Sequence, residues 1–110
     1  MKNPKLLLFG VLAIALIGAP AKQTFTGTIT DNMCARANHS QMRMGSNDAE
    51  CTIACVEAHG ALYVLFDGKE ALTLSDQKTP AKFAGKKVAV VGTLDAKTRT
   101  NQVESIAAAK

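Results

Sequence analysis

The sequence is poor in aromatic residues, and this limits what the protein can bind. Tryptophan is absent, and aromatic residues of all kinds make up 5% of the 110 residues. Proteins that hold single-stranded nucleic acid stack the bases on aromatic side chains, so we expect no nucleic acid partner. The sequence also lacks a glycine-rich phosphate loop and a serine–histidine–acid arrangement. Common motifs of nucleotide-binding and hydrolytic enzymes are therefore missing, and we expect a protein that is not an enzyme.

The one long apolar run lies at the N-terminus. After Lys2 and Lys5 comes the uncharged stretch LLLFGVLAIALI, residues 6–17, followed by the small residues of GAPA. This order is typical of a secretory signal peptide. The run is also shorter than the ~20 residues with which a helix crosses a bilayer. We therefore predict that residues 1–21 are a signal peptide cut after Ala21, that the protein has no stable membrane anchor, and that it is periplasmic or secreted.

The remaining residues, 22–110, carry little excess charge. The formal charge of the whole chain is +4; without the two lysines of the signal peptide it falls to about +2, too little to favour nucleic acid or an anionic membrane. This length suits one small domain. Such a domain buries a limited core, so that a cross-link or a bound metal ion would add useful stability.

Residues 22–110 show the period-2 alternation of β-strands. In TFTGTIT, residues 24–30, apolar residues and glycine alternate with threonines, which is typical of a half-buried strand. Residues 61–75 predict a hairpin that turns at Asp67-Gly68. A connector with about one helical turn, residues 80–84, separates it from a second hairpin with strands at 86–95 and 102–107. The chain thus contains five predicted strands.

One helix is predicted, at residues 47–59. Ser46 or Asn47 can cap its N-terminus, and Glu50, three residues after Asn47, approximates a capping box. Gly60 closes the other end. Five strands form a flat sheet with two open edges unless the sheet curls into a barrel. We therefore predict a mainly β fold: a small five-stranded OB-like barrel or curled antiparallel sheet with one inserted helix.

Several segments of the chain resemble a known type of domain. The stretches GTIT, YVLFDG, LTLSD, FAGKKVAVVGTLD and QVESI are similar to the strands of small secreted bacterial OB-fold-like domains. The pattern D-x-MC-x4-H followed by C-x3-C resembles that of a family of uncharacterised exported bacterial proteins. This resemblance implies an OB-like fold with a Cys/His-containing insertion, residues 31–60, between the first two strands, and it implies no activity. An ordinary OB-fold has its helix between strands three and four, where this chain has TPAKFAG.

Sulfur and imidazole are concentrated in this insertion. All three cysteines, both histidines and three of the four methionines lie between Met33 and His59. On the predicted helix Cys51 and Cys55 lie one turn apart on the same face, so their thiolates could bind one soft ion. A Cys3His set suits zinc, and thiolates with methionine thioethers suit copper(I). The candidate metal ligands are Cys34, His39, Cys51 and Cys55, with Met33, Met42, Met44 and His59 as further candidates.

The same residues have a purely structural interpretation. A disulfide between Cys34 and either Cys51 or Cys55 would tie the loop to the helix and stabilise the fold by ~3 kcal/mol. A Cys51–Cys55 pair is less favourable, because residues four apart in a helix lie near the far limit of disulfide geometry. The third cysteine would remain a free thiol or form a redox-dependent dimer. The two histidines would then be a surface residue and a helix-end residue.

Two functional hypotheses follow. The first is an exported small binding module that takes copper(I) or zinc through the Cys/His/Met cluster. The second is a disulfide-stapled OB-like interaction domain that binds a protein, a glycan or a component of the cell envelope without any metal. They differ in the number of free thiols, because metal binding needs at least two thiolates, whereas the staple leaves one.

Overall fold

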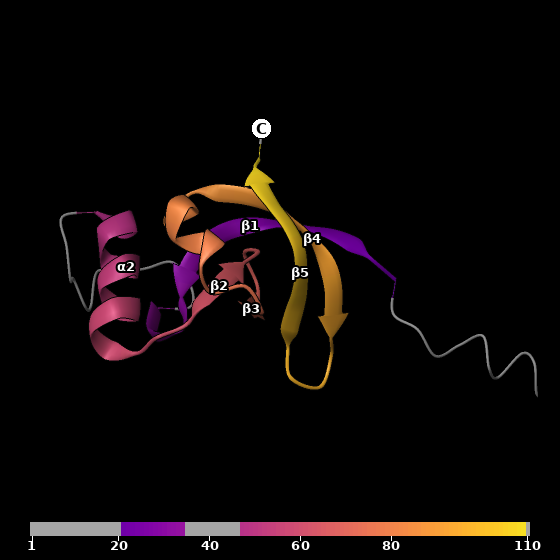
Figure 1. The fold of residues 1–110 in the computed structure, drawn as a ribbon, viewed down its shortest axis with the longest axis horizontal. Coiled ribbons are helices and arrows are strands. Elements are labelled where there is room, and N and C mark those ends of the chain that lie inside the picture. Colours follow the sequence, from indigo (N-terminus) through magenta and orange to yellow (C-terminus); the bar gives the residue numbers. More distant parts are fainter. Residues whose placement is uncertain (1–20, 35–46, 110) are drawn as a thin grey trace, which may run out of the picture.

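The computed structural model describes residues 21–34 and 47–109, which form a mainly β fold with one helix at its side (Figure 1). The elements are β1 (Gln23–Asp31), the 3-10 helix η1 (Asn32–Cys34), α2 (Asp48–His59), β2 (Tyr63–Phe66), β3 (Ala71–Leu74), the 3-10 helix η2 (Thr79–Phe83), β4 (Lys87–Asp95) and β5 (Thr100–Ala108). The predicted fold class is confirmed, and each predicted strand is present to within two residues of its expected ends.

The five strands close into a ring in the order β1-β2-β3-β5-β4. Adjacent strands are antiparallel except β3 and β5, which pair in parallel at Thr73–Thr100 and Leu74–Asn101. The predicted OB-like barrel thus has one parallel junction, between its two hairpins. The parallel pair joins the two hairpins and closes the barrel, which removes the open edges of a flat sheet. The result is a small OB-like curled sheet.

The first strand is shared between two partners. The first part of β1 pairs with β4, and its last residues, from Thr28 to Asp31, pair with β2. Gly27 lies where the strand passes from one partner to the other, and a Cβ atom there would collide with the backbone carbonyl of Phe66. Glycine therefore permits the close approach of two backbones that the closed ring requires.

The core fills the interior of the barrel. It consists of Ile29, Tyr63, Leu65, Leu74, Val88 and Val90, each at most 2% exposed. These residues come from four strands, and Val88 and Val90 follow the alternation predicted for β4. Full burial of one such aliphatic side chain stabilises the fold by roughly 1.5–3 kcal/mol.

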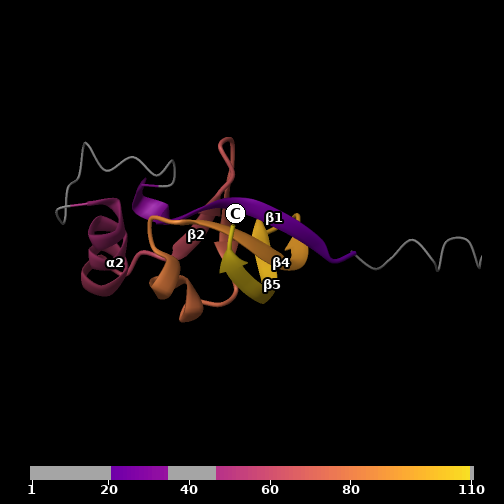
Figure 2. The same cartoon turned by 90° about the horizontal axis from the view of Figure 1, so that it is seen from above.

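The helix begins and ends where the sequence indicates. The Asn47 side chain accepts a hydrogen bond from the Glu50 N–H at 2.9 Å, and Gly60 ends α2 in the left-handed conformation with φ 71°. The Glu50 carboxylate accepts a bond from the Asn47 side-chain amide; in a standard capping box it would accept one from the cap's backbone N–H. The helix lies beside the end of β1 and η1, outside the barrel (Figures 1 and 2).

A buried polar residue, Asn101, lies in the hairpin formed by β4 and β5. Asn101 of β5 is 0% exposed, and neither atom of its side-chain amide has a hydrogen-bond partner among the described residues. It pairs with Leu94 of β4, two residues beyond the irregularity at Val91/Gly92. A Cβ atom on Gly92 would collide with the Asn101 side chain, so that glycine and asparagine fit together here.

The predicted signal peptide, residues 1–21, lies almost entirely outside the described residues. Within residues 21–34 and 47–109, no helix is long and apolar enough to cross a membrane.

Candidate functional site

The turn after β1 is built around one carboxylate. Asp31, the last residue of β1, is 0% exposed. Its Oδ1 accepts hydrogen bonds from the backbone N–H groups of Met33 and Cys34, both at 3.0 Å. The Thr30 hydroxyl donates to the Cys34 carbonyl oxygen at 3.2 Å. A strand that ends in Thr-Asp therefore turns at once into η1, and this turn fixes the backbone of Cys34.

The helix brings the other two cysteines to the same place. The buried residues of α2 are Cys51, Thr52 and Cys55, and both cysteines are 0% exposed. Their i, i+4 spacing puts them on one face, and α2 packs against β1. The Thr52 hydroxyl on this face has no hydrogen-bond partner among the described residues. The buried side of the helix is thus made of thiols and a hydroxyl.

Strand end and helix meet in a group that we call the Asp31–cysteine cluster: Asp31, Cys34, Cys51 and Cys55. The Cys55 thiol donates a hydrogen bond to the Asp31 carboxylate. Burial raises the pKa of Cys55, and the nearby charges of Asp31, Cys34 and Cys51 raise it further. Burial also raises the pKa of Cys34, with additional contributions from Asp31 and Cys51. Cys34 and Cys55 therefore each lie within electrostatic reach of the other members of the cluster or of most of them.

The cluster is not arranged as a finished metal centre. None of the three cysteines forms a disulfide within the part of the chain that the structure describes. Within the described residues, no group of three or more His, Cys, Asp or Glu side chains surrounds a position for a metal ion. The raised thiol pKa values keep Cys34 and Cys55 protonated at neutral pH, which makes them poor nucleophiles. Thiol catalysis at the cluster is therefore disfavoured. The roles that remain for its cysteines are binding of a soft ion and formation of a disulfide.

The predicted ligands separate into two groups. Cys34, Cys51 and Cys55 lie within electrostatic reach of one another, whereas His39, Met42 and Met44 lie outside the described residues. The other predicted candidates lie on the surface: His59 is exposed in the last turn of α2, and Met33 is 42% exposed. The predicted site residues did not include Asp31, whose carboxylate lies beside the Cys55 thiol. Its position three residues before Cys34, at the end of an alternating strand, was the available signal.

No protein-family model, no curated protein and no solved structure matches this chain. The resemblance to exported OB-fold-like proteins therefore remains a prediction. What the molecule does has to follow from its own residues.

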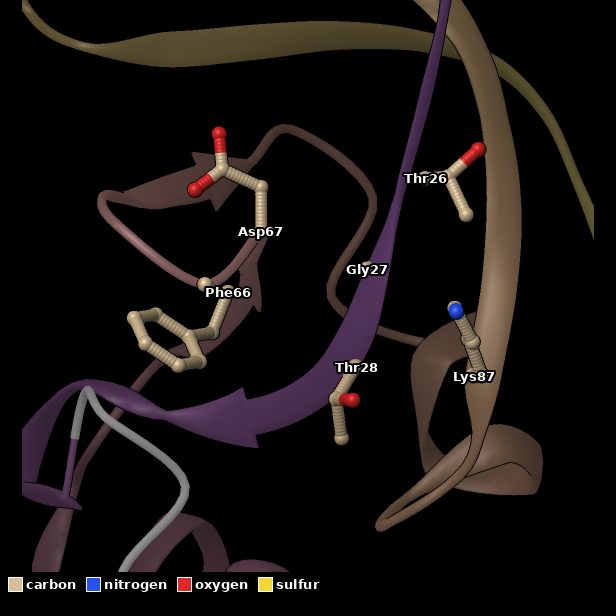
Figure 3. Close-up of a pocket in the computed structure, with 7 residues that line it drawn as sticks. Thr26, Gly27, Thr28, Phe66, Asp67 and Lys87 are labelled. Atoms are coloured by element: carbon tan, nitrogen blue, oxygen red, sulfur yellow. The ribbon is translucent and has the colours of Figure 1, made fainter.

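A surface pocket lies beside β1, at the point where its pairing partner changes from β4 to β2. An open pocket of about 450 Å³ is lined by residues of β1, of the β2–β3 turn and of the start of β4, among them Thr26, Thr28, Phe66, Asp67 and Lys87 (Figure 3). The Asp67 carboxylate accepts hydrogen bonds from the N–H groups of Glu70 and Lys69, which lower its pKa. The pocket offers hydroxyls, one ring and charges of both signs, and it contains none of the cysteines.

Proposed function

We propose that this protein is an exported binding module that holds one soft metal ion at the Asp31–cysteine cluster. The observation that carries the proposal is that Cys34 of η1 and Cys55 of α2 both lie within electrostatic reach of the buried Asp31 carboxylate and of Cys51. Thiolates from Cys34, Cys51 and Cys55 are ligands that zinc and copper(I) both accept. Export and membership of the uncharacterised OB-fold-like family are parts of this proposal, supported by the N-terminal sequence and by the motif.

The energetic balance of the cluster supports a bound ion. A carboxylate at 0% exposure is costly unless it is paired, and each hydrogen bond that it accepts recovers part of the cost. A small domain with a limited core gains little from placing an acid and two fully buried thiols together. A cation at this point would offset the charge of Asp31 and add stability to the folded state, because it binds only there.

A second candidate is the disulfide-stapled interaction domain. It is favoured by the finding that no three-ligand group surrounds a common point among the described residues. A disulfide needs only one pair, and Cys34 lies close to both helix thiols. In this alternative the cysteines are structural, and the pocket between β1 and the β2–β3 turn is the surface that meets a protein, glycan or envelope component.

Intact mass separates the two candidates. The full-length chain would be expressed and isolated from the compartment in which it accumulates. Its mass would be measured under native conditions before alkylation, and under denaturing conditions after alkylation of free thiols. We expect an N-terminus at Lys22, three alkylated cysteines after denaturation, and a native mass increment of one metal ion. Cys34→Ser should lose the ion, and the exposed Ser105→Ala should retain it. One alkylated thiol, a deficit of two hydrogens and no metal would instead establish the staple.

A further inference from the structure

The backbone hydrogen bonds of β1 alternate between its two edges. Ile29 makes both of its bonds on the β4 side: its N–H donates to the Lys86 carbonyl oxygen at 3.0 Å, and its carbonyl oxygen accepts from the Gly85 N–H at 2.8 Å. Successive residues of an antiparallel strand direct these groups to opposite edges. The N–H and carbonyl groups of Thr28 and Thr26 therefore point to the other edge, the one on which β2 lies.

Strand β2 covers only the later part of that edge. Its last residue, Phe66, pairs with Thr28. Residues 23–27 pair with β4 and, among the described residues, with no other strand. The N–H and carbonyl groups of Thr24 and Thr26 therefore face an open side. Residues 23–27 contain no proline and no charged side chain, which are devices that protect the edges of natural sheets.

The pocket of about 450 Å³ lies where the open edge ends. Phe66 and Lys87 are both direct partners of Thr28, one on each side of it, and opposed residues of neighbouring strands share a face. Thr26, two residues before Thr28, lies on the same face. Figure 3 shows Phe66 and Lys87 on opposite sides of β1. The pocket therefore spans three strands, with an aromatic ring on one side and an ammonium group on the other.

The fold does not use this ring or this ammonium group. Among the described residues, the half-buried rings of Phe25 and Phe83 pack against the core, whereas the half-buried ring of Phe66 belongs neither to the core nor to the side chains packed against it. Lys87 is exposed and takes part in none of the ion pairs formed within the described part of the chain. Both groups are therefore available to a ligand.

The negative charge of the pocket is already engaged. The Asp67 Oδ1 accepts hydrogen bonds from the backbone N–H groups two and three residues later, both at 2.8 Å. Asp31 and Asp95 begin turns of the same kind. The charge in the pocket that lacks a partner is therefore the positive charge of Lys87.

We infer that the open edge of β1 binds the carboxyl-terminal segment of another protein, which adds to the sheet as an extended strand and places its final carboxylate beside Lys87. In such strand addition, main-chain hydrogen bonds give affinity and adjacent pockets give specificity. The inference goes beyond the proposed metal site and does not depend on it, because none of the cysteines lines the pocket. It names one kind of partner for a surface that the disulfide-stapled alternative leaves open.

The blocked end of the edge explains why the ligand is a chain terminus. An added strand cannot run past Gly27, because Phe66 already occupies the edge at Thr28. A strand parallel to β1 would end there with its carboxylate, and an antiparallel strand would begin there with its ammonium group. The unpaired ammonium group of Lys87 favours the carboxylate, and with it the parallel orientation. The ring of Phe66 favours an apolar last side chain.

The probe is a peptide selected from a library of random hexapeptides displayed with free carboxyl termini. The selected peptide is synthesised with a carboxylate and, separately, with an amide at its end, and the affinity of both forms is measured by fluorescence anisotropy. Lys87→Gln removes the charge of the pocket. Lys86→Gln makes the same change at the adjacent exposed lysine, which does not line the pocket.

Two proline variants test the edge itself. Thr26→Pro removes an N–H group from the open edge of β1, where proline is compatible with a strand. Ala108→Pro removes one from the open edge of β5: the N–H of the next residue, Ala109, bonds to β4, so that of Ala108 points away from it. Thermal unfolding of both variants shows whether the fold is kept.

We expect wild type to bind the amide form about fivefold more weakly than the acid form, the upper range for an exposed ion pair. Lys87→Gln should lose the same factor with the acid form and nothing further with the amide form. Thr26→Pro should weaken both forms about 5–10-fold, the loss expected for one backbone hydrogen bond. Lys86→Gln and Ala108→Pro should match wild type.

A library that yields no binder would overturn the inference, as would a binder that is insensitive to both Lys87→Gln and Thr26→Pro. Equal affinity for the acid and amide forms would contradict the role of the carboxylate. Lys87→Gln and the amide peptide decide the question even where the proline variant fails to fold. Peptide affinity should be the same in protein washed with a chelator, so failure of this site and failure of the proposed metal site are separate results.

Discussion

Asp31 and Asn101 are both 0% exposed, and they lie in different parts of the barrel. Asp31 accepts hydrogen bonds from two backbone N–H groups and from the Cys55 thiol. Asn101 has no partner for its side-chain amide among the described residues. A buried polar group that is satisfied helps to specify the structure, while an unsatisfied one costs free energy. The same degree of burial therefore has opposite consequences in the two regions.

Removal of the satisfied group should have the largest effect. Asp31→Ala leaves the N–H groups of Met33 and Cys34 without their acceptor, and we expect it to reduce the free energy of unfolding by about 2–3 kcal/mol. Asp95→Ala removes an exposed turn of the same kind and should cost about 0.5–1 kcal/mol. Urea unfolding of both variants measures the difference. Equal losses would show that burial does not distinguish the two turns.

The second largest change in stability is expected at Gly27, where the pairing partner of β1 changes from β4 to β2. In Gly27→Ala the new methyl group meets the Phe66 carbonyl, and because backbone has to move, we expect a loss of about 1–3 kcal/mol. Gly60→Ala, which places a methyl group in open space at a left-handed residue, should cost about 1 kcal/mol. Thermal unfolding of the two variants compares crowding with backbone strain. A Gly27 variant as stable as wild type would contradict the close approach.

Removal of the unsatisfied group should act in the opposite direction. Asn101→Leu replaces the unpaired amide by an apolar side chain of similar size, and we expect a gain of about 1 kcal/mol in the free energy of unfolding. The measurement is the urea midpoint with an unchanged slope. A destabilised Asn101→Leu would indicate that an internal water molecule or another group satisfies the amide in solution.

The smallest effect is a pH dependence of the cluster. In the folded, reduced protein without metal, the pKa values of Cys34 and Cys55 lie above their ordinary value of 9.0. The folded state therefore holds these protons more tightly than the unfolded state. Its stability is fully present below pH 9 and declines as the pH rises above that value. Unfolding free energies measured between pH 8 and about 10.5 should fall less in Cys55→Ala than in wild type, and equal slopes would contradict the shift.

Local patterns were enough to predict most of the fold. Asn47 and Gly60 mark the ends of α2, and Val88 and Val90 reveal the inner face of β4, because caps and alternation depend on neighbours in the sequence. The parallel pairing of Leu74 with Asn101 depends on how two hairpins meet, which no local pattern encodes. It therefore needed the structure.

The candidate site was predicted in part for the same reason. The three cysteines were recognised by residue type and spacing. Asp31 appeared in the sequence as the first residue of the insertion, residues 31–60, and of the pattern D-x-MC. Its burial arises from the packing of α2 on β1, a tertiary event, and that contact brings its carboxylate to the thiols.

The position of β1 in the ring also determines the order in which the domain can assemble. Its register joins Gln23 to Gly92 and Phe25 to Val90, so the first part of β1 cannot pair until β4, the second-last strand in the sequence, is available. Contacts between residues so distant in sequence slow folding. The β2–β3 hairpin can form early, but the ring of strands cannot close until β4 is available to pair with β1.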